Sequence, residues 1–223
     1  MYTHLLLDLD GTLIDSSSGI YHAFAHACYN LGLPSPDYTN FCLSIGPPVQ
    51  QIAKNLYPFL DPKSLEQFRS SFRQEYDLFS FSMAEWYPDV LNTLVSLCRD
   101  PNLRISIVTN KPTAPAVKLT KAAAVEICFS RIVGIDYRVF HRIGPIFSSK
   151  ADALTYVLST DSSANEHHIY IGDTPSDQDA CEHCQIPFIA ALYGFHRWNT
   201  HKKPAICLER FGDIITVLQA AKL

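Results

Sequence analysis

The sequence has no excess of positive charge and no long apolar run. Its 223 residues include 18 lysines and arginines against 22 aspartates and glutamates, which gives a formal net charge of -4. Proteins that bind nucleic acid polymers need a basic surface, so we expect no such partner. The apolar run at residues 5–7 ends at Asp8 and follows no basic segment, so it is too short for a signal peptide or a membrane span. We therefore expect a soluble protein without a membrane partner.

The seven cysteines follow no regular spacing, and internal repeats and low-complexity segments are lacking as well. Because the number of cysteines is odd and the chain is not small, a disulfide framework is disfavoured, and reduced thiols in a cytoplasmic compartment are expected. A chain of 223 residues can bury a sizeable core, either as one large domain or as a domain with an insertion.

Short apolar runs alternate with amphipathic stretches over most of the chain, which is the pattern of a parallel sheet flanked by helices. We expect buried strands at residues 5–9, 103–108, 168–171 and 187–192, and helices at roughly 89–99, 114–124, 149–158, 176–184 and 214–218. The predicted fold class is α/β, with a Rossmann-like parallel sheet core.

Residues 16–82 break this alternation. Helical periodicity recurs within them at 20–31, 49–56 and 65–76, and turn residues separate these segments without a convincing buried strand. We therefore predict an all-α insertion at 16–82, placed directly after the first strand. Residues 1–15 and 83–223 then form the α/β core.

Two carboxylates lie at the carboxyl end of the first strand, the end where ligands bind in open α/β sheets. Asp8 and Asp10 are separated by Leu9, so alternation along a strand would aim both carboxylates the same way. Gly11 permits an unusual backbone turn, and Thr12 can hydrogen-bond within it. Neighbouring carboxylates repel each other, and a divalent cation or a shared proton relieves that repulsion. An ordinary Asp-Gly turn is the alternative for this motif taken alone.

Three further segments carry polar groups at strand ends or helix starts. Thr109 ends the second strand, where its hydroxyl and the following backbone N–H groups can hold an anion or simply cap a helix. Lys150 lies in the first turn of a helix, where a cation opposes the macrodipole unless an anion is near; the alternative is a surface lysine. Asp173 follows the third strand, and Asp177 lies in the next helical turn, where it can also serve as a cap.

All of these groups should reach the same edge of the sheet. Carboxylates at two places suit a hard, oxygen-seeking cation such as Mg²⁺, whereas threonine and lysine suit a phosphate. This convergence is stronger evidence than any one motif.

In their order and spacing the segments resemble the motifs of the haloacid dehalogenase-like hydrolase superfamily, and in particular its phosphoglycolate phosphatase-like subgroup. Residues 8–12 (Asp-Leu-Asp-Gly-Thr) resemble the first motif, Thr109-Asn110 the second, Lys150 the third and Gly172-Asp173-x-x-x-Asp177 the fourth. The resemblance extends from Asp8 to about Gly194. The insertion at 16–82 is then similar to the family's C1 helical cap, and its turn at 44–48 to the substrate-specificity loop of that cap.

The resemblance implies an enzyme, a phosphoric monoester hydrolase, and assigns roles to these residues. Asp8 would be the nucleophile that forms an aspartyl-phosphate, and Asp10 would be the acid and base. Thr109 and Lys150, with backbone amides near Gly11 and Asn110, would bind and stabilise the transferring phosphoryl group. Mg²⁺ would be held by Asp8, the backbone carbonyl of Asp10 and Asp173, and Asp177 would complete the metal site or orient Lys150.

The implied substrate is a small phosphorylated metabolite, and the implied assembly is a monomer or a weak homodimer. Asp10 distinguishes phosphoryl transfer from dehalogenation, and Thr12 is typical of phosphatases in this superfamily. Ala151 stands after Lys150 where many phosphoglycolate phosphatases have proline, which is more similar to members that act on nucleotides or have no assigned substrate. A nucleotide 5′-phosphatase, a sugar phosphomutase and a non-catalytic binding protein are the alternatives.

Overall fold

The computed structural model describes residues 2–135, 146–160, 167–198 and 204–220. The chain forms two compact units, one made of Met1–Ile14 and Trp86–Leu223 and the other of Asp15–Glu85. The insertion predicted at 16–82 falls within the second unit. The chain passes between the units at β2 (Ile14–Asp15) and β3 (Glu85–Trp86), which pair as a two-stranded sheet.

A six-stranded parallel sheet forms the centre of the first unit, in the order β5-β4-β1-β6-β7-β8. The strands are β1 (His4–Leu7), β4 (Arg104–Thr109), β5 (Arg131–Gly134), β6 (His168–Gly172), β7 (Phe188–Ala191) and β8 (Cys207–Leu208). All four residues of β1 are buried, as expected for a central strand that is covered on both faces.

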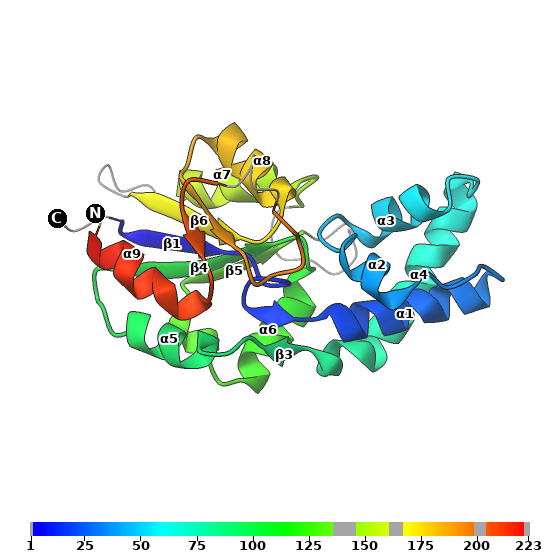
Figure 1. Cartoon of the computed structure of the whole chain (residues 1–223), viewed down its shortest axis with the longest axis horizontal. Coiled ribbons are helices and arrows are strands. Elements are labelled where there is room, and N and C mark those ends of the chain that lie inside the picture. The colour runs from blue at the N-terminus through cyan, green and yellow to red at the C-terminus, as the bar shows by residue number, and fades with distance from the viewer. Residues whose placement is uncertain (1, 136–145, 161–166, 199–203, 221–223) are drawn as a thin grey trace. The chain divides into compact units, whose positions relative to one another are not determined.

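Helices cover both faces of this sheet (Figure 1). The helices α7 (Lys150–Thr160) and α8 (Pro175–Cys184) lie on one face, and α5 (Val90–Leu97), α6 (Thr113–Ala122) and α9 (Ile214–Ala220) lie on the other. Short 3-10 helices span Glu126–Cys128 and Phe211–Asp213. Under α7 and α8 the core packs Leu6, Val108 and Tyr170 from three adjacent strands. The predicted α/β fold class is confirmed.

Each of the predicted core strands and helices is present, with ends shifted by a few residues. Two short strands escaped the sequence pattern. Strand β5 has four residues and begins with Arg131, while β8 has only two. Neither segment stands out in the sequence as a longer apolar run, and both become strands because a sheet edge is available for pairing.

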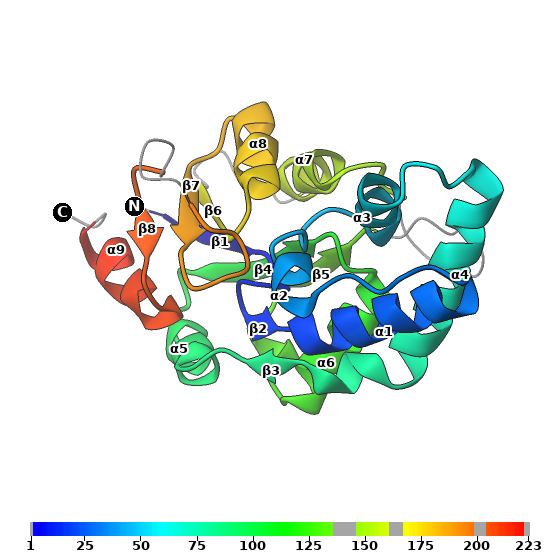
Figure 2. The same ribbon diagram turned by 45° about the vertical axis from the view of Figure 1, so that its right-hand side comes forward.

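The second unit is helical (Figure 2). Its helices are α1 (Ser17–Asn30), α2 (Tyr38–Cys42), α3 (Val49–Leu56) and α4 (Pro62–Leu78), and a 3-10 helix follows at Ser80–Met83. The side chain of Asp61 accepts a hydrogen bond from the Ser64 N–H, and Pro62 fills the first helical position, so α4 begins there.

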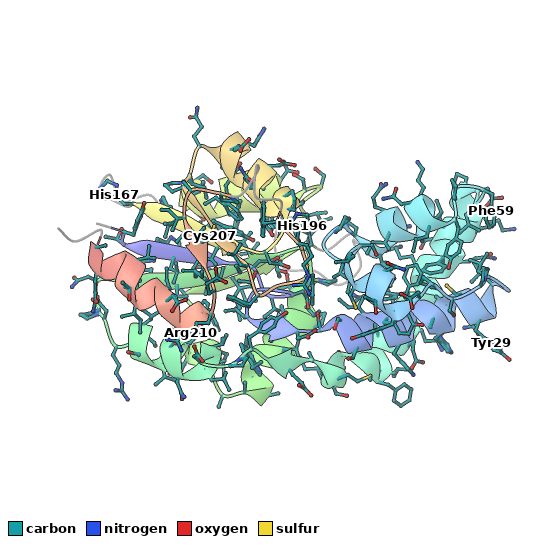
Figure 3. All side chains as sticks on the ribbon, in the orientation of Figure 1. Tyr29, Phe59, His167, His196, Cys207 and Arg210 are labelled. Carbon is teal, nitrogen blue, oxygen red and sulfur yellow. The ribbon has the colours of Figure 1, made fainter. Side chains whose placement is uncertain are left out.

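Aromatic packing holds this unit together. The ring of Phe24 on α1 lies 4.6 Å from that of Phe41 and 4.7 Å from that of Phe68, measured between ring centres. Tyr29 and Phe59 of the same unit are exposed instead and are labelled in Figure 3. Among the described residues, none of the helices is both long and apolar enough to cross a bilayer.

Candidate active site

Three adjacent strands bring their carboxyl ends to one place on the sheet. Asp8 follows β1, Thr109 is the last residue of β4, and Asp173 follows β6. In the sheet, β1 lies between β4 and β6, and the Asp8 N–H continues the ladder by donating to the Ile171 carbonyl at 2.9 Å. Residues that are more than 160 positions apart in sequence, such as Asp8 and Asp173, thus meet because parallel strands share one carboxyl edge.

Asp8, Asp173 and Asp177 form a buried carboxylate cluster. One oxygen from each lies within 4.8 Å of the others, and at most 6% of any of the three residues is exposed. Burial raises the pKa of Asp8 to about 6, and the charge of Asp177 adds to the rise, while Lys150 and Thr109 oppose it. Burial likewise holds the pKa of Asp173 well above its ordinary value, with further contributions from Asp177 and Asp8.

Two oxygens of this cluster fit a cation. Within the described part of the chain, Oδ1 of Asp8 and Oδ1 of Asp173 are buried and accept no hydrogen bond. A buried carboxylate oxygen is costly without a partner, and oxygen atoms of this kind are the preferred ligands of hard divalent cations. The donor set and its unsatisfied oxygens therefore match a magnesium-type ion.

Lys150 supplies the positive charge beside these carboxylates. Its Nζ lies 2.9 Å from Oδ2 of Asp8 and also contacts Oδ1 of Asp177. Burial lowers the pKa of Lys150, but Asp177 and Asp8 outweigh it and hold the pKa above the ordinary value. Lys150 is the first residue of α7, and only 5% of it is exposed. The alternative of a surface lysine is therefore wrong. Its carboxylate partners provide the anion that a lysine in a first helical turn requires.

Asp177 has two partners, one for each oxygen. Oδ1 pairs with Lys150, whereas Oδ2 accepts hydrogen bonds from the Thr174 N–H at 2.9 Å and from the Thr174 hydroxyl at 2.8 Å. The Thr174 contacts form the capping box of α8, so the helix start and the lysine are fixed by one side chain. Asp177 therefore caps α8 and contacts Lys150 with the same side chain.

Glycines allow backbone to approach the carboxylates closely. Gly11 has a φ of +81°, and a Cβ at this position would overlap the Asp173 carboxylate. A Cβ at Gly194 would overlap Asp173 too, and the neighbouring Phe195 N–H donates to Oδ2 of Asp173 at 2.8 Å. Sequence reasoning missed Gly194 and Phe195 as site residues. The available signal was a glycine just after the strand predicted at 187–192.

Asp10 takes a different partner from Asp8. Strand β1 ends at Leu7, and the chain then turns so that the Leu9 carbonyl accepts from the Leu13 and Ile14 N–H groups at 2.9 and 3.0 Å. The alternation of side chains along a strand therefore does not extend to Asp10. The carboxylate oxygens of Asp10 lie 2.7 and 3.0 Å from Nζ of Lys111. The Asp10 carboxylate does not belong to the cluster of three.

Lys111 was not singled out by the sequence, although it stands two residues after Thr109 at the same strand end. Its residue is only 6% exposed, and its N–H donates to the Thr109 hydroxyl oxygen at 3.2 Å. Asn110, between the two, is half-buried in the same loop. The signal that could have identified Lys111 is its position at the edge of the sheet that carries several carboxylates, where a positive charge is favourable.

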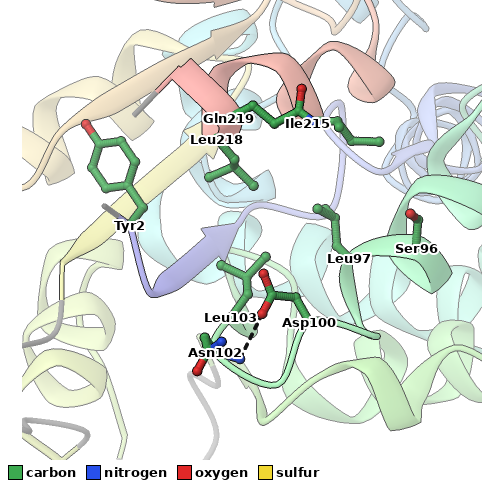
Figure 4. A pocket seen from close by; sticks show the side chains of 9 residues that line it. All are labelled: Tyr2, Ser96, Leu97, Asp100, Asn102, Leu103, Ile215, Leu218 and Gln219. Atoms are coloured by element: carbon green, nitrogen blue, oxygen red, sulfur yellow. Dashed lines mark hydrogen bonds between the residues drawn. The ribbon is translucent and has the colours of Figure 1, made fainter. Parts of the chain in front are cut away.

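The opposite end of the sheet has a hollow of about 160 Å³ next to the residues that precede β1 and β4 (Figure 4). Its walls combine the apolar side chains of Leu97, Leu103 and Leu218 with the polar Asp100 and Asn102. The Asp100 carboxylate accepts the Asn102 N–H at 2.9 Å and so stabilises a local turn. Its lining contains one carboxylate, that of Asp100, and no lysine or arginine. The hollow therefore does not repeat the arrangement of carboxylates and lysine at the other end of the sheet.

A sequence model described as haloacid dehalogenase-like hydrolase matches residues 5–191 of the chain. The chain belongs to this family. The matched range contains Asp8, Thr109, Lys150 and the Asp173–Asp177 segment, the residues of the buried site. The predicted family resemblance is confirmed.

Curated relatives of this chain differ in the activity that their names state. A 5′-nucleotidase from Pseudomonas aeruginosa is 28% identical over 197 residues, which cover 87% of this chain and 84% of that protein. A phosphoglycolate phosphatase from Photorhabdus laumondii is 24% identical over 220 residues, covering 96% and 91%. The tyrosine-protein kinase PtkA from Mycobacterium tuberculosis is 25% identical over 217 residues, covering 97% and 71%.

Solved structures of the family have the same fold. A haloacid dehalogenase-like family hydrolase from Streptococcus pneumoniae superimposes with a TM-score of 0.84 at 27% identity, covering 98% of this chain and 99% of that one. The prediction of an enzyme of the phosphatase type is thus confirmed at the level of the family and of its phosphatase-named relatives.

Proposed function

We propose that the protein is a Mg²⁺-dependent phosphatase that hydrolyses small phosphomonoesters through an aspartyl-phosphate on Asp8. The observation that carries the proposal is the buried pairing of Asp8 with Lys150 beside Asp173, with one Asp8 oxygen and one Asp173 oxygen unsatisfied. A buried carboxylate held next to a cation is equipped to attack phosphorus and to tolerate the negative charge of the substrate.

The proposed reaction has two steps. A carboxylate oxygen of Asp8 forms a bond to phosphorus while the bond to the ester oxygen breaks, and Asp10 gives its proton to the departing alkoxide. Asp10 then takes a proton from water, whose oxygen attacks the aspartyl-phosphate and releases inorganic phosphate. The Thr109 hydroxyl, the Lys150 ammonium and backbone N–H groups at Gly11 and Asn110 would stabilise the transferring phosphoryl group.

Asp8, Asp173 and the backbone carbonyl of Asp10 would hold the metal, with Asp177 beside them. When bound, Mg²⁺ would offset the repulsion between the Asp8 carboxylate and the phosphate oxygens. Because both oxygens of Asp177 already have partners, its main part in the site is to orient Lys150.

For the substrate we propose 2-phosphoglycolate or a similarly small ester, in line with the phosphoglycolate phosphatase among the relatives. A nucleotide 5′-phosphate is the second candidate, because a relative named 5′-nucleotidase is 28% identical. We further propose that residues 16–82 act as the cap that selects between them. A cytoplasmic location is consistent with the free thiols of the chain.

The first experiment measures hydrolysis of p-nitrophenyl phosphate with Mg²⁺ and with a chelator. Wild type should turn over only with Mg²⁺, and Asp8→Asn should lower kcat by at least ~10³-fold because the nucleophile is lost. Lys121→Met, a change of an exposed lysine on α6, is the matched control and should keep wild-type activity. Activity that survives in Asp8→Asn would rule out the proposed nucleophile.

A panel of esters then separates the substrate candidates by kcat/KM. It should contain 2-phosphoglycolate, nucleoside 5′-monophosphates, sugar phosphates with and without a bisphosphate activator, and pyrophosphate. Release of phosphate from one of the first two classes supports the proposal, whereas an isomerised sugar phosphate without phosphate release would identify a mutase.

A further inference from the structure

The ammonium group of Lys111 is held in a buried place with Asp10 as its counter-ion. Nζ lies 2.7 Å from Oδ1 and 3.0 Å from Oδ2, so the contact spans both carboxylate oxygens. Only 4% of the lysine side chain and 18% of the aspartate side chain are exposed. A buried ion pair gains little stability overall, so its retention calls for a role in fixing one arrangement of groups.

The loop that carries Lys111 is fixed from both sides. The Lys111 N–H donates to the Thr109 hydroxyl oxygen, and its carbonyl lies so close to Gly134 of β5 that a Cβ there would overlap it. The Gly134 N–H in turn donates to the Thr113 hydroxyl oxygen at 3.1 Å. The lysine therefore reaches toward Asp10 from an anchored backbone.

The backbone of Asp10 is anchored as well. Gly11, with its positive φ, donates its N–H to the Ile14 carbonyl at 2.8 Å, which closes the turn that follows Asp10. With both backbones fixed, the ion pair is a contact that can hold the Asp10 carboxylate in one place. Asp10 is not a member of the cluster formed by Asp8, Asp173 and Asp177.

We propose that Lys111 is a positioning residue for Asp10: it keeps this carboxylate apart from the three-carboxylate cluster, so that Asp10 stays available for proton transfer and does not become a side-chain metal ligand. The proposal rests on the proposed phosphatase function. Without the lysine, the Asp10 carboxylate would lose this ion pair, and we expect it to turn toward a cation held by Asp8, only two residues away along the chain. Proton transfer depends on placement within a fraction of an ångström, and loss of that placement lowers the rate.

The test compares Lys111→Met, Lys111→Gln, Lys111→Arg, Asp10→Asn and the double variant Asp10→Asn/Lys111→Met, with Lys121→Met as the matched surface control. Steady-state rates are measured on an alkyl ester, 2-phosphoglycolate, and on p-nitrophenyl phosphate, whose leaving group needs little protonation. We expect Lys111→Met to lower kcat for the alkyl ester by ~30–100-fold, with KM changed less than ~3-fold and a smaller loss on p-nitrophenyl phosphate. Lys111→Arg should recover most of the loss.

The double variant shows whether the lysine acts through Asp10. If it does, removing Lys111 from the Asp10→Asn protein changes the remaining rate less than ~2-fold, because the interaction is already absent. Loss of the same size in both backgrounds, or a loss confined to KM, would show direct contact with the substrate and would overturn the proposal.

A binding measurement tests the same idea without turnover. Calorimetric titration with Mg²⁺ and Mn²⁺ should show at least ~3-fold tighter binding by Lys111→Met than by wild type, and Asp10→Asn should cancel this gain. Unchanged cation affinity in Lys111→Met and Lys111→Gln would overturn the proposal even if wild type proved inactive as a phosphatase. Circular dichroism and thermal melting identify any variant that fails to fold, and Lys111→Gln then replaces Lys111→Met.

Discussion

The two units of the chain place their charged side chains differently. The first buries Asp8, Lys111, Lys150, Asp173 and Asp177. In the described residues of the second unit no charged side chain is buried, and its ion pairs lie on the helix surface. Arg69 with Glu66 and Arg73 with Asp77 are examples.

The difference separates what serves chemistry from what serves stability. Burying a charge is costly unless a partner of opposite sign is present, so three buried carboxylates beside one lysine add little net stability, which agrees with the ligand-binding role proposed above. The second unit instead gains stability from apolar burial, since Phe24, Phe41 and Phe68 are almost fully buried and in ring contact. Mutations should therefore affect the two units in different ways.

The largest effect on stability should come from Lys150→Met. Removing this cation leaves Asp8 and Asp177 buried without their counter-ion, which costs about 3–5 kcal/mol in free energy of unfolding, and turnover should fall by more than ~100-fold. Denaturant titration in chelator measures the first quantity, with Lys121→Met as the control. A Lys150→Met protein as stable as wild type would show that the buried charges do not depend on one another.

Phe24→Ala should cost about 3–4 kcal/mol because it opens a cavity in the aromatic core of the second unit. Tyr29 lies on the same helix with 82% of its surface exposed, so Tyr29→Ala is the matched control, expected within about 0.5 kcal/mol of wild type. Amide hydrogen exchange should show faster opening of α1 and α4, with little change in β1 and β6. If amide protection fell equally in both units, the stability of the first unit would depend on the aromatic core of the second, and the contrast between the units would not hold.

Asp173→Asn should stabilise the metal-free protein by about 1–2 kcal/mol, because it removes one of the repelling buried carboxylates and keeps an oxygen for the Phe195 N–H. A carboxyl whose pKa is raised by folding binds more protons in the folded state, so stability falls as the pH rises through the interval between the two values. For Asp8 that interval runs from 3.8 to about 6.

The gain from Asp173→Asn should therefore be larger at about pH 8 than at about pH 5. Thermal melting in chelator at both pH values measures it, and a Mg²⁺ titration should show that the variant has lost the stabilisation by metal that wild type gains. A variant less stable than wild type at the higher pH would mean that the carboxylates of the cluster do not repel one another.

The smallest effect should come from Glu66→Gln on α4. Its partner Arg69 lies three residues away on the same helix and 53% of the Glu66 side chain is exposed, so the change should alter the free energy of unfolding by less than about 0.5 kcal/mol. The melting temperature should fall slightly at low ionic strength and match wild type at high salt. If Glu66→Gln lowered the free energy of unfolding as much as Phe24→Ala, charged side chains would be important for the stability of the second unit as well.

The sequence by itself determined the α/β class, the long core elements and the residues at the strand ends. Apolar runs, turn glycines and helical periodicity are local signals, and Asp8, Thr109 and Asp173 follow the apolar runs that contain β1, β4 and β6. Because parallel strands share a carboxyl edge, the convergence of these residues follows from the sequence pattern.

Only the tertiary structure decided which distant groups contact each other in the site. Lys111 meets Asp10 across 101 residues of sequence, Lys150 meets Asp177 across 27, and Phe195 meets Asp173 across 22. Strands β5 and β8 likewise exist only as edges added to a sheet. Local patterns reveal which face of an element is buried, but they hold no information on which distant group lies across from it, because packing of the whole chain sets that distance.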